Sequence, residues 1–299
     1  IIISYFNYSL INFFFKNEFK KKQVSVIIAV KNGEHSLPRF LQSLIQQTYK
    51  DQIEFIIVDD NSIDNSANII LSYMKKDDRI VLTSSDFGNE LLSHKKRTLD
   101  AGIKIANGDI LLFTDVDCIL PKNWVINTLS FFSNDIDYVV GYSEVPSSSN
   151  LVTLFQKLDF FMLMNATHSS INKNWFWACS GQNQAYKKSV YIKNDGFNKI
   201  ANILQGDDTL FSQISNHNIE NFKAVFAFNK LNKVYCRKEK KIKSFLLQRI
   251  RWSGDAIKTW KLNKNFLLMS ICTFFTNFIL LINLFLYVFQ LITLNQLII

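Results

Sequence analysis

Apolar runs alternate with stretches of helical spacing through roughly the first 120 residues. The runs have few polar breaks, which predicts strands buried on both faces of a sheet. The predicted strands are 24–30, 55–58, 80–83 and 110–113, and the predicted helices between them are 37–47, about 66–75 and 95–106. Strand and helix in alternation predict an α/β fold: a mostly parallel sheet with helices on both faces.

Beyond Pro121 the alternation weakens. Aromatic residues become more frequent, and the hydrophobic pattern no longer repeats as strand then helix. We expect strands at 138–140 and 223–228, an aromatic-rich amphipathic helix at 151–165, an irregular segment at 175–186, and a helix that opens at 205–209 and reaches about residue 215.

Both ends of the chain are apolar. Residues 1–15 carry no charge and are followed by lysines, while 266–299 contain no charged residue at all. A membrane-spanning helix needs about 20 residues, so 1–15 is interpreted as a truncated membrane helix, with a signal peptide as the alternative. The region 266–299 is predicted to be transmembrane and also truncated. Lysines beside the apolar ends place the intervening domain in the cytoplasm.

Between these ends lies a basic stretch, 238–264, in which Trp252 and Trp260 are interleaved with Lys and Arg. That combination is typical of a helix lying on a membrane surface, and nucleic-acid binding is the alternative that we do not favour. The predicted organisation is an N-terminal membrane segment at 1–15, an α/β domain at 22–237, a basic interfacial region at 238–264 and a transmembrane region at 266–299.

Charge and cysteine usage narrow the class of protein. The net charge of +9 over 299 residues favours an anionic partner, such as a phosphorylated substrate or an anionic lipid. The four cysteines have no CxxC spacing, which argues against a zinc site or a disulfide scaffold and fits a reducing compartment.

Pairs of acidic residues follow the predicted elements at three places. Asp59 and Asp60 follow the second strand, Asp115 and Asp117 follow the fourth, and 207–208 are two aspartates at a helix start. Ligands of open α/β sheets bind beyond the carboxyl ends of the strands, and paired carboxylates there can hold a hard divalent cation that carries phosphate. Helix capping and a polar turn are the alternatives for each pair taken alone.

Six segments then occur in an order that resembles the family-2 glycosyltransferases of GT-A fold, especially their membrane-bound branch. They are Val24–Glu34, Phe55–Asp64 with Asp-Asp-x-Ser, Lys95–Gly102, Asp115-Val-Asp117 as DxD, Gly206-Asp-Asp208 as the (Glu/Asp)-Asp motif, and Gln248-Arg-Ile-Arg-Trp252 as QxxRW. Asp100 departs from the usual Leu-Asn-x-Gly pattern, and Asp207 stands where Glu is commoner. The resemblance covers about residues 24–252.

The resemblance implies roles for the acidic residues. Asp115 and Asp117 would hold Mg²⁺ or Mn²⁺ on the donor diphosphate, and Asp208 would be the catalytic base. The implied donor-binding residues are Asp59, Asp60, Lys95 and Asp115, and the implied acceptor and diphosphate region comprises Asp207, Gln248, Arg251 and Trp252. The segment Cys179-Ser-Gly181 is expected in the acceptor wall.

The resulting hypothesis is a membrane-anchored, inverting, metal-dependent glycosyltransferase with a cytoplasmic catalytic domain. It would move a sugar from a nucleotide-diphosphate sugar, with a UDP-sugar favoured, to a lipid or glycan acceptor. A processive polysaccharide synthase is the alternative enzyme, because QxxRW occurs in both kinds. An inactive membrane scaffold is the alternative outside enzymes, although every acidic motif position is filled.

Overall fold

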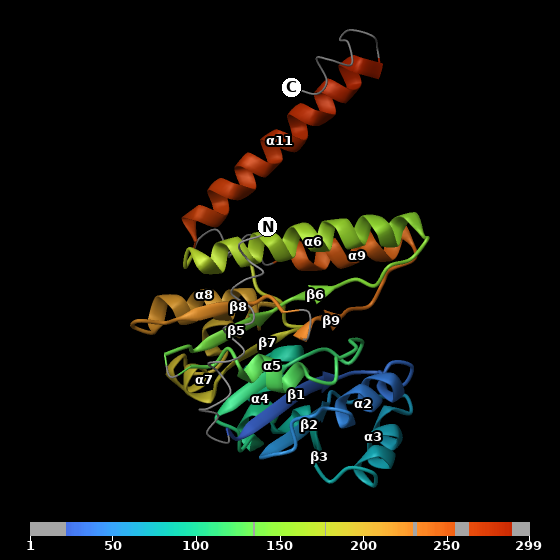
Figure 1. Cartoon of the computed structure of the whole chain (residues 1–299), viewed down its shortest axis with the longest axis vertical. Coiled ribbons are helices and arrows are strands. Elements are labelled where there is room, and N and C mark those ends of the chain that lie inside the picture. The colour runs from blue at the N-terminus through green and yellow to red at the C-terminus, as the bar shows by residue number, and fades with distance from the viewer. Residues whose placement is uncertain (1–21, 134, 177, 230–231, 255–262, 289–299) are drawn as a thin grey trace.

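We analysed a computed structural model of the chain, which describes residues 22–133, 135–176, 178–229, 232–254 and 263–288. The predicted N-terminal membrane segment, 1–15, lies outside these residues. A mixed sheet forms the centre of the molecule, and its helices are packed on both faces (Figure 1). The predicted α/β architecture is therefore confirmed.

Seven strands build the main sheet in the order β3-β2-β1-β4-β7-β5-β8, and β6 pairs with β9 in a small second sheet. The strands are β1 Val24–Val30, β2 Ile53–Asp59, β3 Ile80–Ser84, β4 Ile110–Phe113, β5 Tyr138–Gly141, β6 Ser143–Glu144, β7 Gln184–Lys187, β8 Ala224–Ala227 and β9 Val234–Tyr235. The four strands predicted first, β1 to β4, are parallel to one another.

β7 was not predicted, because its segment was expected to be irregular. It lies between β4 and β5 and is antiparallel to both, so the sheet is mixed. Its sequence, Gln-Ala-Tyr-Lys, lacks the apolar run of the other central strands. Its neighbours on both sides, rather than its own composition, bury Ala185 and Tyr186 completely.

The helices agree with the predicted ones except near the middle of the chain. They are α2 Leu37–Ile45, α3 Ser66–Met74, α4 Lys95–Ile105, α5 Trp124–Leu129, α6 Leu151–Asn172, α7 Lys188–Lys193, α8 Thr209–Asn218, α9 Ile242–Ser253 and α11 Lys264–Val288, with 3₁₀ turns η2 Ser85–Phe87 and η3 Asn198–Ile200. α6 continues seven residues past the predicted end at 165, and α5 and α7 were not predicted.

Side chains of the central strands alternate between two hydrophobic clusters, one on each face of the sheet. In β1, Val26 and Ile28 point into the cluster that includes α2, while Ile27 points into the cluster under α4. α4 packs closely on β1 and β2 because Gly102 has no side chain. A Cβ there would lie 2.7 Å from Ile27 Cγ2 and 2.9 Å from Val58 Cγ2.

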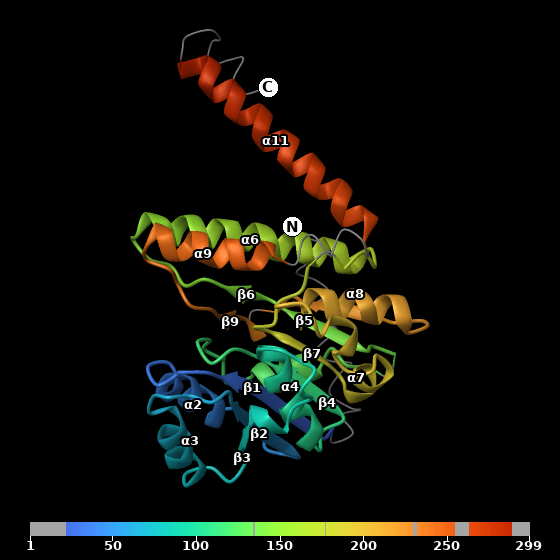
Figure 2. The same cartoon turned by 180° about the vertical axis from the view of Figure 1, so that it is seen from behind.

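α6 and α9 lie side by side beyond the small sheet, and α11 extends away from them (Figures 1 and 2). The basic region predicted at 238–264 thus contains α9, although 255–262 lie outside the described residues. The apolar C-terminal region forms α11 as far as Val288. In the part of the chain that the structure describes, no helix qualifies as a membrane span.

Candidate active site

The acidic residues converge because the parallel strands that precede them end at one edge of the sheet. Val30 of β1 is in register with Asp59 of β2, and Ile27 is in register with Phe113 of β4. Asp60 therefore follows β2 at the same edge at which Asp115 follows β4. This is the edge where open α/β sheets bind ligands.

Asp60 is held in place by the loop after β1. Its backbone N–H donates to the carbonyl of Val30 at 2.7 Å, and its Oδ2 accepts from Lys31 Nζ at 2.9 Å. Burial would raise the pKa of Asp60, but the hydrogen bond and charge of Lys31 outweigh it and lower the pKa. Asp60 is thus a carboxylate near neutral pH. It can accept hydrogen bonds from a ligand that displaces Lys31.

Helix capping does not explain this pair of aspartates. α3 begins at Ser66, and its N-cap residue is Asn65 rather than Asp59 or Asp60. Asp59 instead accepts a 3.3 Å hydrogen bond from the N–H of Ser62, within the turn that follows β2. Asp59 therefore shapes the loop, and Asp60 is the member of the pair that faces a partner on another element.

Lys95 connects two of the acidic pairs. It is the first residue of α4, and its Nζ lies 2.8 Å from Asp115 Oδ1 and 3.3 Å from Asp207 Oδ2. Burial alone would lower the pKa of Lys95, but Asp115 and then Asp207 outweigh it and raise the pKa. Lys95 is therefore a fixed positive charge between the segment after β4 and the segment before α8.

Asp208 is the most perturbed carboxyl group in this cluster. Its Oδ1 accepts from the N–H of Thr209 at 2.6 Å and its Oδ2 accepts from the N–H of Gly181 at 3.0 Å. Burial, and then the neighbouring charge of Asp207, raise the pKa of Asp208 to about 7. Asp208 is both the N-cap of α8 and a carboxylate able to accept a proton near neutral pH.

Gly181 brings a third segment to this cluster. A Cβ at Gly181 would lie 3.3 Å from Lys95 Nζ, 3.4 Å from Asp208 Oδ2 and 3.5 Å from Asp207 Oδ2. The structure therefore places the Cys179-Ser-Gly181 turn directly beside the acidic cluster. Its predicted place in the acceptor wall stays a prediction. The lack of a side chain at Gly181 lets the turn approach Lys95 and the two carboxylates closely.

Asp117 is a carboxylate whose nearby positive charges do not offset its burial and the neighbouring negative charge. Burial, and then the charge of Asp115, raise its pKa, whereas Arg237 and Lys95 act in the opposite direction. A divalent cation would relieve this repulsion, and Asp115 and Asp117 provide the hard oxygen ligands that Mg²⁺ and Mn²⁺ prefer. Over the described residues no three His, Cys, Asp or Glu side chains form a ready metal cluster. Two carboxylates fit a cation that is completed by phosphate oxygens.

The QxxRW residues lie on α9, and their contacts are with α6. The Nε2 of Gln156 lies 3.4 Å from Gln248 Oε1, and the ring of Trp252 lies 6.1 Å from that of Phe160. Arg251 is exposed. Across the described ranges, no hydrogen bond or ion pair joins these three residues to the acidic cluster. The structure thus brings Lys95 and the aspartates of the DxD and (Glu/Asp)-Asp motifs together, whereas the QxxRW residues lie on α9, in the neighbouring layer of helices.

Two cations near the acids were not among the predicted site residues. Lys31 pairs with Asp60, and Arg237 is close enough to Asp117 to oppose the rise in the pKa of that carboxyl group. Arg237 is brought there because Ile119 and Tyr235 exchange backbone hydrogen bonds at 2.9 and 3.1 Å. Lys31 stands in the first-strand motif, so the sequence held a signal for it. Arg237 depends on a long-range pairing that the sequence does not indicate.

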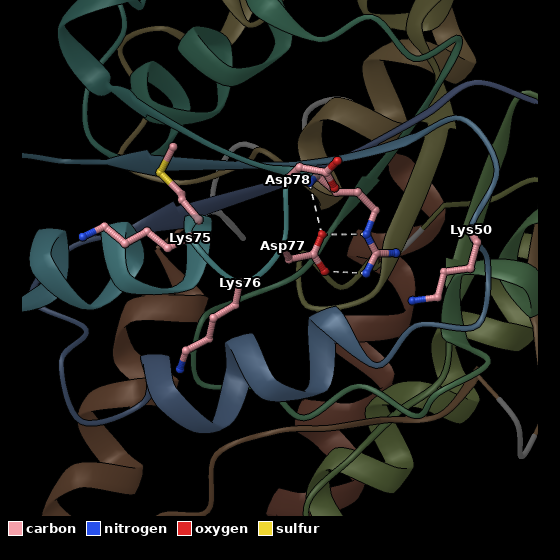
Figure 3. A pocket seen from close by; sticks show the side chains of 7 residues that line it. Lys50, Lys75, Lys76, Asp77 and Asp78 are labelled. Carbon is pink, nitrogen blue, oxygen red and sulfur yellow. Dashed lines mark hydrogen bonds and ion pairs between the residues drawn. The ribbon is translucent and has the colours of Figure 1, made fainter.

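A separate surface pocket of about 550 Å³ lies at the opposite edge of the sheet (Figure 3). Its lining residues are Lys50, Met74, Lys75, Lys76, Asp77, Asp78 and Arg79. Arg79 immediately precedes β3 and is paired with Asp77 at 2.6 Å. The pocket is therefore at the amino-terminal ends of the strands, away from the conventional ligand edge.

Comparison with known proteins decides the family. Residues 25–194, more than half of the 299-residue chain, match glycosyl transferase family 2. The chain belongs to this family. The matched segment of the family-2 glycosyltransferase contains the acids after β2 and β4 and ends before Asp207 and Asp208.

Curated proteins similar to this chain are also named as glycosyltransferases. GlyG, a glycosyltransferase of Streptococcus pneumoniae serotype 4, is 28% identical over 59% of this chain. WfgD of Escherichia coli, a UDP-Glc:alpha-D-GlcNAc-diphosphoundecaprenol beta-1,3-glucosyltransferase, is 28% identical over 47% of this chain. The chain spans only about half the length of these relatives, 58% and 54% respectively.

Solved structures share the fold at low identity. The mannosyltransferase PcManGT from Pyrobaculum calidifontis, in complex with GDP-Man and Mn²⁺, has a TM-score of 0.62 and 16% identity, covering 86% of this chain and 70% of that chain. TarS 1-349 of S. aureus in complex with UDP-GlcNAc has a TM-score of 0.51 and 20% identity, covering 74% and 60%. The family-2 chain therefore has the GT-A fold.

Proposed function

We propose that this family-2 glycosyltransferase moves a sugar from a nucleotide-diphosphate sugar to an acceptor hydroxyl and inverts the anomeric carbon. The observation that carries the proposal is the cluster of Lys95, Asp115, Asp207 and Asp208 at the ligand edge of a GT-A sheet. It combines a carboxylate that is poised near neutral pH with paired charges that suit a diphosphate. A single base and direct displacement account for inversion.

In the proposed donor site, Asp60 accepts hydrogen bonds from the nucleotide base, and Lys31 is displaced as the donor enters. Asp115 and Asp117 would hold Mg²⁺ or Mn²⁺, and the bound ion would supply positive charge for the departing diphosphate. Lys95 positions Asp115 through their 2.8 Å contact and adds positive charge on the same side. A UDP-sugar is the donor we favour, since TarS was solved with UDP-GlcNAc and WfgD is named as a UDP-Glc enzyme.

In the proposed acceptor site, Asp208 removes the proton from the attacking hydroxyl. The N–H groups of Thr209 and Gly181 hold the carboxylate at 2.6 and 3.0 Å, which fixes its direction. Gln248, Arg251 and Trp252 are proposed to border the acceptor and diphosphate region once substrates are bound.

We also propose attachment to a membrane, with a lipid or glycan as acceptor and the catalytic domain in the cytoplasm. Support comes from the absence of charge in 266–299 and from the exposure of apolar side chains along α11. Leu268, Phe275 and Phe285 are 62%, 56% and 58% exposed. WfgD, whose named acceptor carries a diphosphoundecaprenol lipid, is consistent with a lipid-linked acceptor.

A donor and acceptor panel tests the proposal. The purified protein in detergent is incubated with Mn²⁺ or Mg²⁺, UDP- and GDP-sugars, and a membrane-lipid extract, and the products are read by mass spectrometry. Addition of one sugar to a lipid supports single transfer. A ladder of products that differ by one sugar supports the alternative enzyme, a processive polysaccharide synthase. Absence of turnover together with absence of metal-dependent nucleotide binding would favour the inactive scaffold.

A further inference from the structure

α6 carries more apolar side chains than its contact with the protein core buries. Its outward-facing apolar residues are Leu151 (81% exposed), Leu154 (44%), Phe155 (58%), Leu158 (59%), Phe161 (48%) and Met162 (63%). Its buried face is mixed, with three apolar residues and four polar ones: Phe160, Met164, Ile171, Thr153, Gln156, Thr167 and Ser170. The exposed positions recur three and four residues apart, so they form one continuous stripe. A stripe of this size in water indicates a surface that something covers.

Polar contacts explain why the other side of α6 faces the protein. Thr153 Oγ1 donates to the carbonyl of Glu239 at 2.9 Å, and Gln156 Oε1 accepts from the N–H of Glu239 at 2.8 Å. Gln156 Nε2 also contacts Gln248 of α9. These hydrogen bonds fix the rotation of α6 about its axis. The apolar stripe therefore cannot turn inward without losing them.

α9 extends the same surface. Its exposed apolar residues are Ile242 (57%), Leu246 (51%), Leu247 (57%) and Ile250 (66%). The two helices lie side by side in both views (Figures 1 and 2), and the rings of Phe155 and Phe245 meet edge to face at 5.6 Å. We call the exposed apolar side chains of α6 and α9 together the α6–α9 face.

The charges around this face are almost all positive. Asp159 is the only acidic residue of α6, and it is ion-paired with Arg249, while α9 has no acidic residue. Exposed basic residues border the face at Lys238, Lys240, Lys241, Lys243 and Arg251. Two copies of this surface would bring like charges together in a symmetric dimer. Apolar side chains with a basic border instead complement the surface of an anionic bilayer.

We propose that the α6–α9 face lies in the headgroup region of an anionic bilayer. The proposal deepens the membrane attachment proposed above by adding a second contact, separate from α11. This contact would hold the catalytic sheet in a fixed orientation to the lipid surface, so that a lipid-linked acceptor reaches the acidic cluster without leaving the membrane.

The test measures the depth of a label on the full chain in vesicles that contain brominated and anionic lipids. A fluorophore is attached at Leu158→Cys, with Leu71→Cys as the matched control, both in a Cys272→Ser background. Leu71 is 46% exposed on α3, at the far end of the molecule from α6 (Figure 1). Cys118 and Cys236 are buried, and burial raises the pKa of the Cys179 thiol, so none of these cysteines should take up the label.

We expect quenching at position 158 to be several times that at position 71, and to weaken in neutral vesicles or high salt. Equal quenching at the two positions would overturn the proposal, as would cross-linking of position 158 between two copies without quenching. Co-sedimentation with the vesicles separately reports attachment through α11. A bound protein with an unquenched label at position 158 would thus refute this inference while leaving the proposed membrane attachment intact.

A paired substitution gives a functional readout. Leu154→Asp with Leu158→Asp should lower transfer to a lipid acceptor in vesicles at least tenfold and leave donor hydrolysis unchanged. Leu71→Asp should change neither rate. Unchanged transfer in the double variant would contradict the inference. Absence of donor hydrolysis and transfer in all the proteins, the wild type included, would instead refute the proposed function.

Discussion

At the scale of single residues, the proposed chemistry depends on the surroundings of one carboxyl group, that of Asp208. Asp208 is only partly exposed, and it lies beside Asp207 and accepts hydrogen bonds from two backbone N–H groups. Burial and like charge favour its protonated form, while the N–H groups favour the carboxylate. Their balance places the pKa of Asp208 at about 7, where a general base is most useful.

The first prediction concerns pH. A base must be deprotonated to act, so kcat/KM should fall as pH drops below about 7, with Asp208 as the controlling group. Asp207→Asn removes the like charge that helps to raise this pKa, so the acid limb of the profile should move to lower pH. Asp78→Asn, an exposed change at the opposite sheet edge, should leave the limb in place. An acid limb that does not move in Asp207→Asn would contradict this electrostatic account.

The second prediction concerns Lys95. Lys95→Met removes the positive charge between Asp115 and Asp207, so the two carboxylates would repel one another. We expect donor affinity to fall at least tenfold and the free energy of unfolding to fall by about 1–2 kcal/mol, a value reduced because the side chain is partly exposed. Lys95→Arg should recover part of both. Calorimetric donor titration and chemical denaturation measure the two effects, and donor binding at wild-type affinity in Lys95→Met would count against the assignment.

At the scale of elements, the first half of the fold could be predicted because its strands are buried on both faces. β1 and β4 are nearly unbroken apolar runs, and their predicted bounds agree with the structure. β7 has no such run, since its position between β4 and β5 is set by long-range pairing. The acidic residues could be predicted because most of them follow recognisable strands. The position of Arg237 beside Asp117 could not, because it depends on the long-range pairing of Ile119 with Tyr235.

The third prediction concerns the seat of α4 on the sheet. Gly102→Ala would push a methyl group to within 3 Å of Ile27 and Val58 side chains, so α4 would have to shift. We expect a loss of about 1–3 kcal/mol in the free energy of unfolding, together with weaker donor binding because Lys95 begins the same helix. Gly254→Ala is the control, since its nearest contact is the Arg251 carbonyl at 3.3 Å. Equal stability of the two variants in urea denaturation would show that the close packing is not needed.

At the scale of the whole molecule, the candidate active site and the proposed membrane contacts occupy separate layers. The acidic cluster lies at one edge of the main sheet, whereas α6, α9 and α11 gather at one end of the molecule (Figures 1 and 2).

The fourth prediction follows from the exposed apolar side chains of α11. The protein should stay in the membrane fraction after alkaline carbonate extraction, and Leu268→Asp with Phe275→Asp should release part of it. Full recovery of the wild-type protein in the supernatant would refute membrane insertion.

The central claim is that this family-2 chain is a glycosyltransferase in which Asp208 acts as the base, and Asp208→Asn tests it most directly. The folded protein raises the pKa of Asp208, so ionisation of this group lowers the free energy of unfolding as pH rises from about 4 to 7. The neutral amide side chain avoids that cost, so the Asp208→Asn variant should remain folded at pH 8. We predict that transfer falls by at least 10²-fold while donor binding and melting temperature stay close to wild type. Transfer within a few-fold of wild type in this variant would contradict the account.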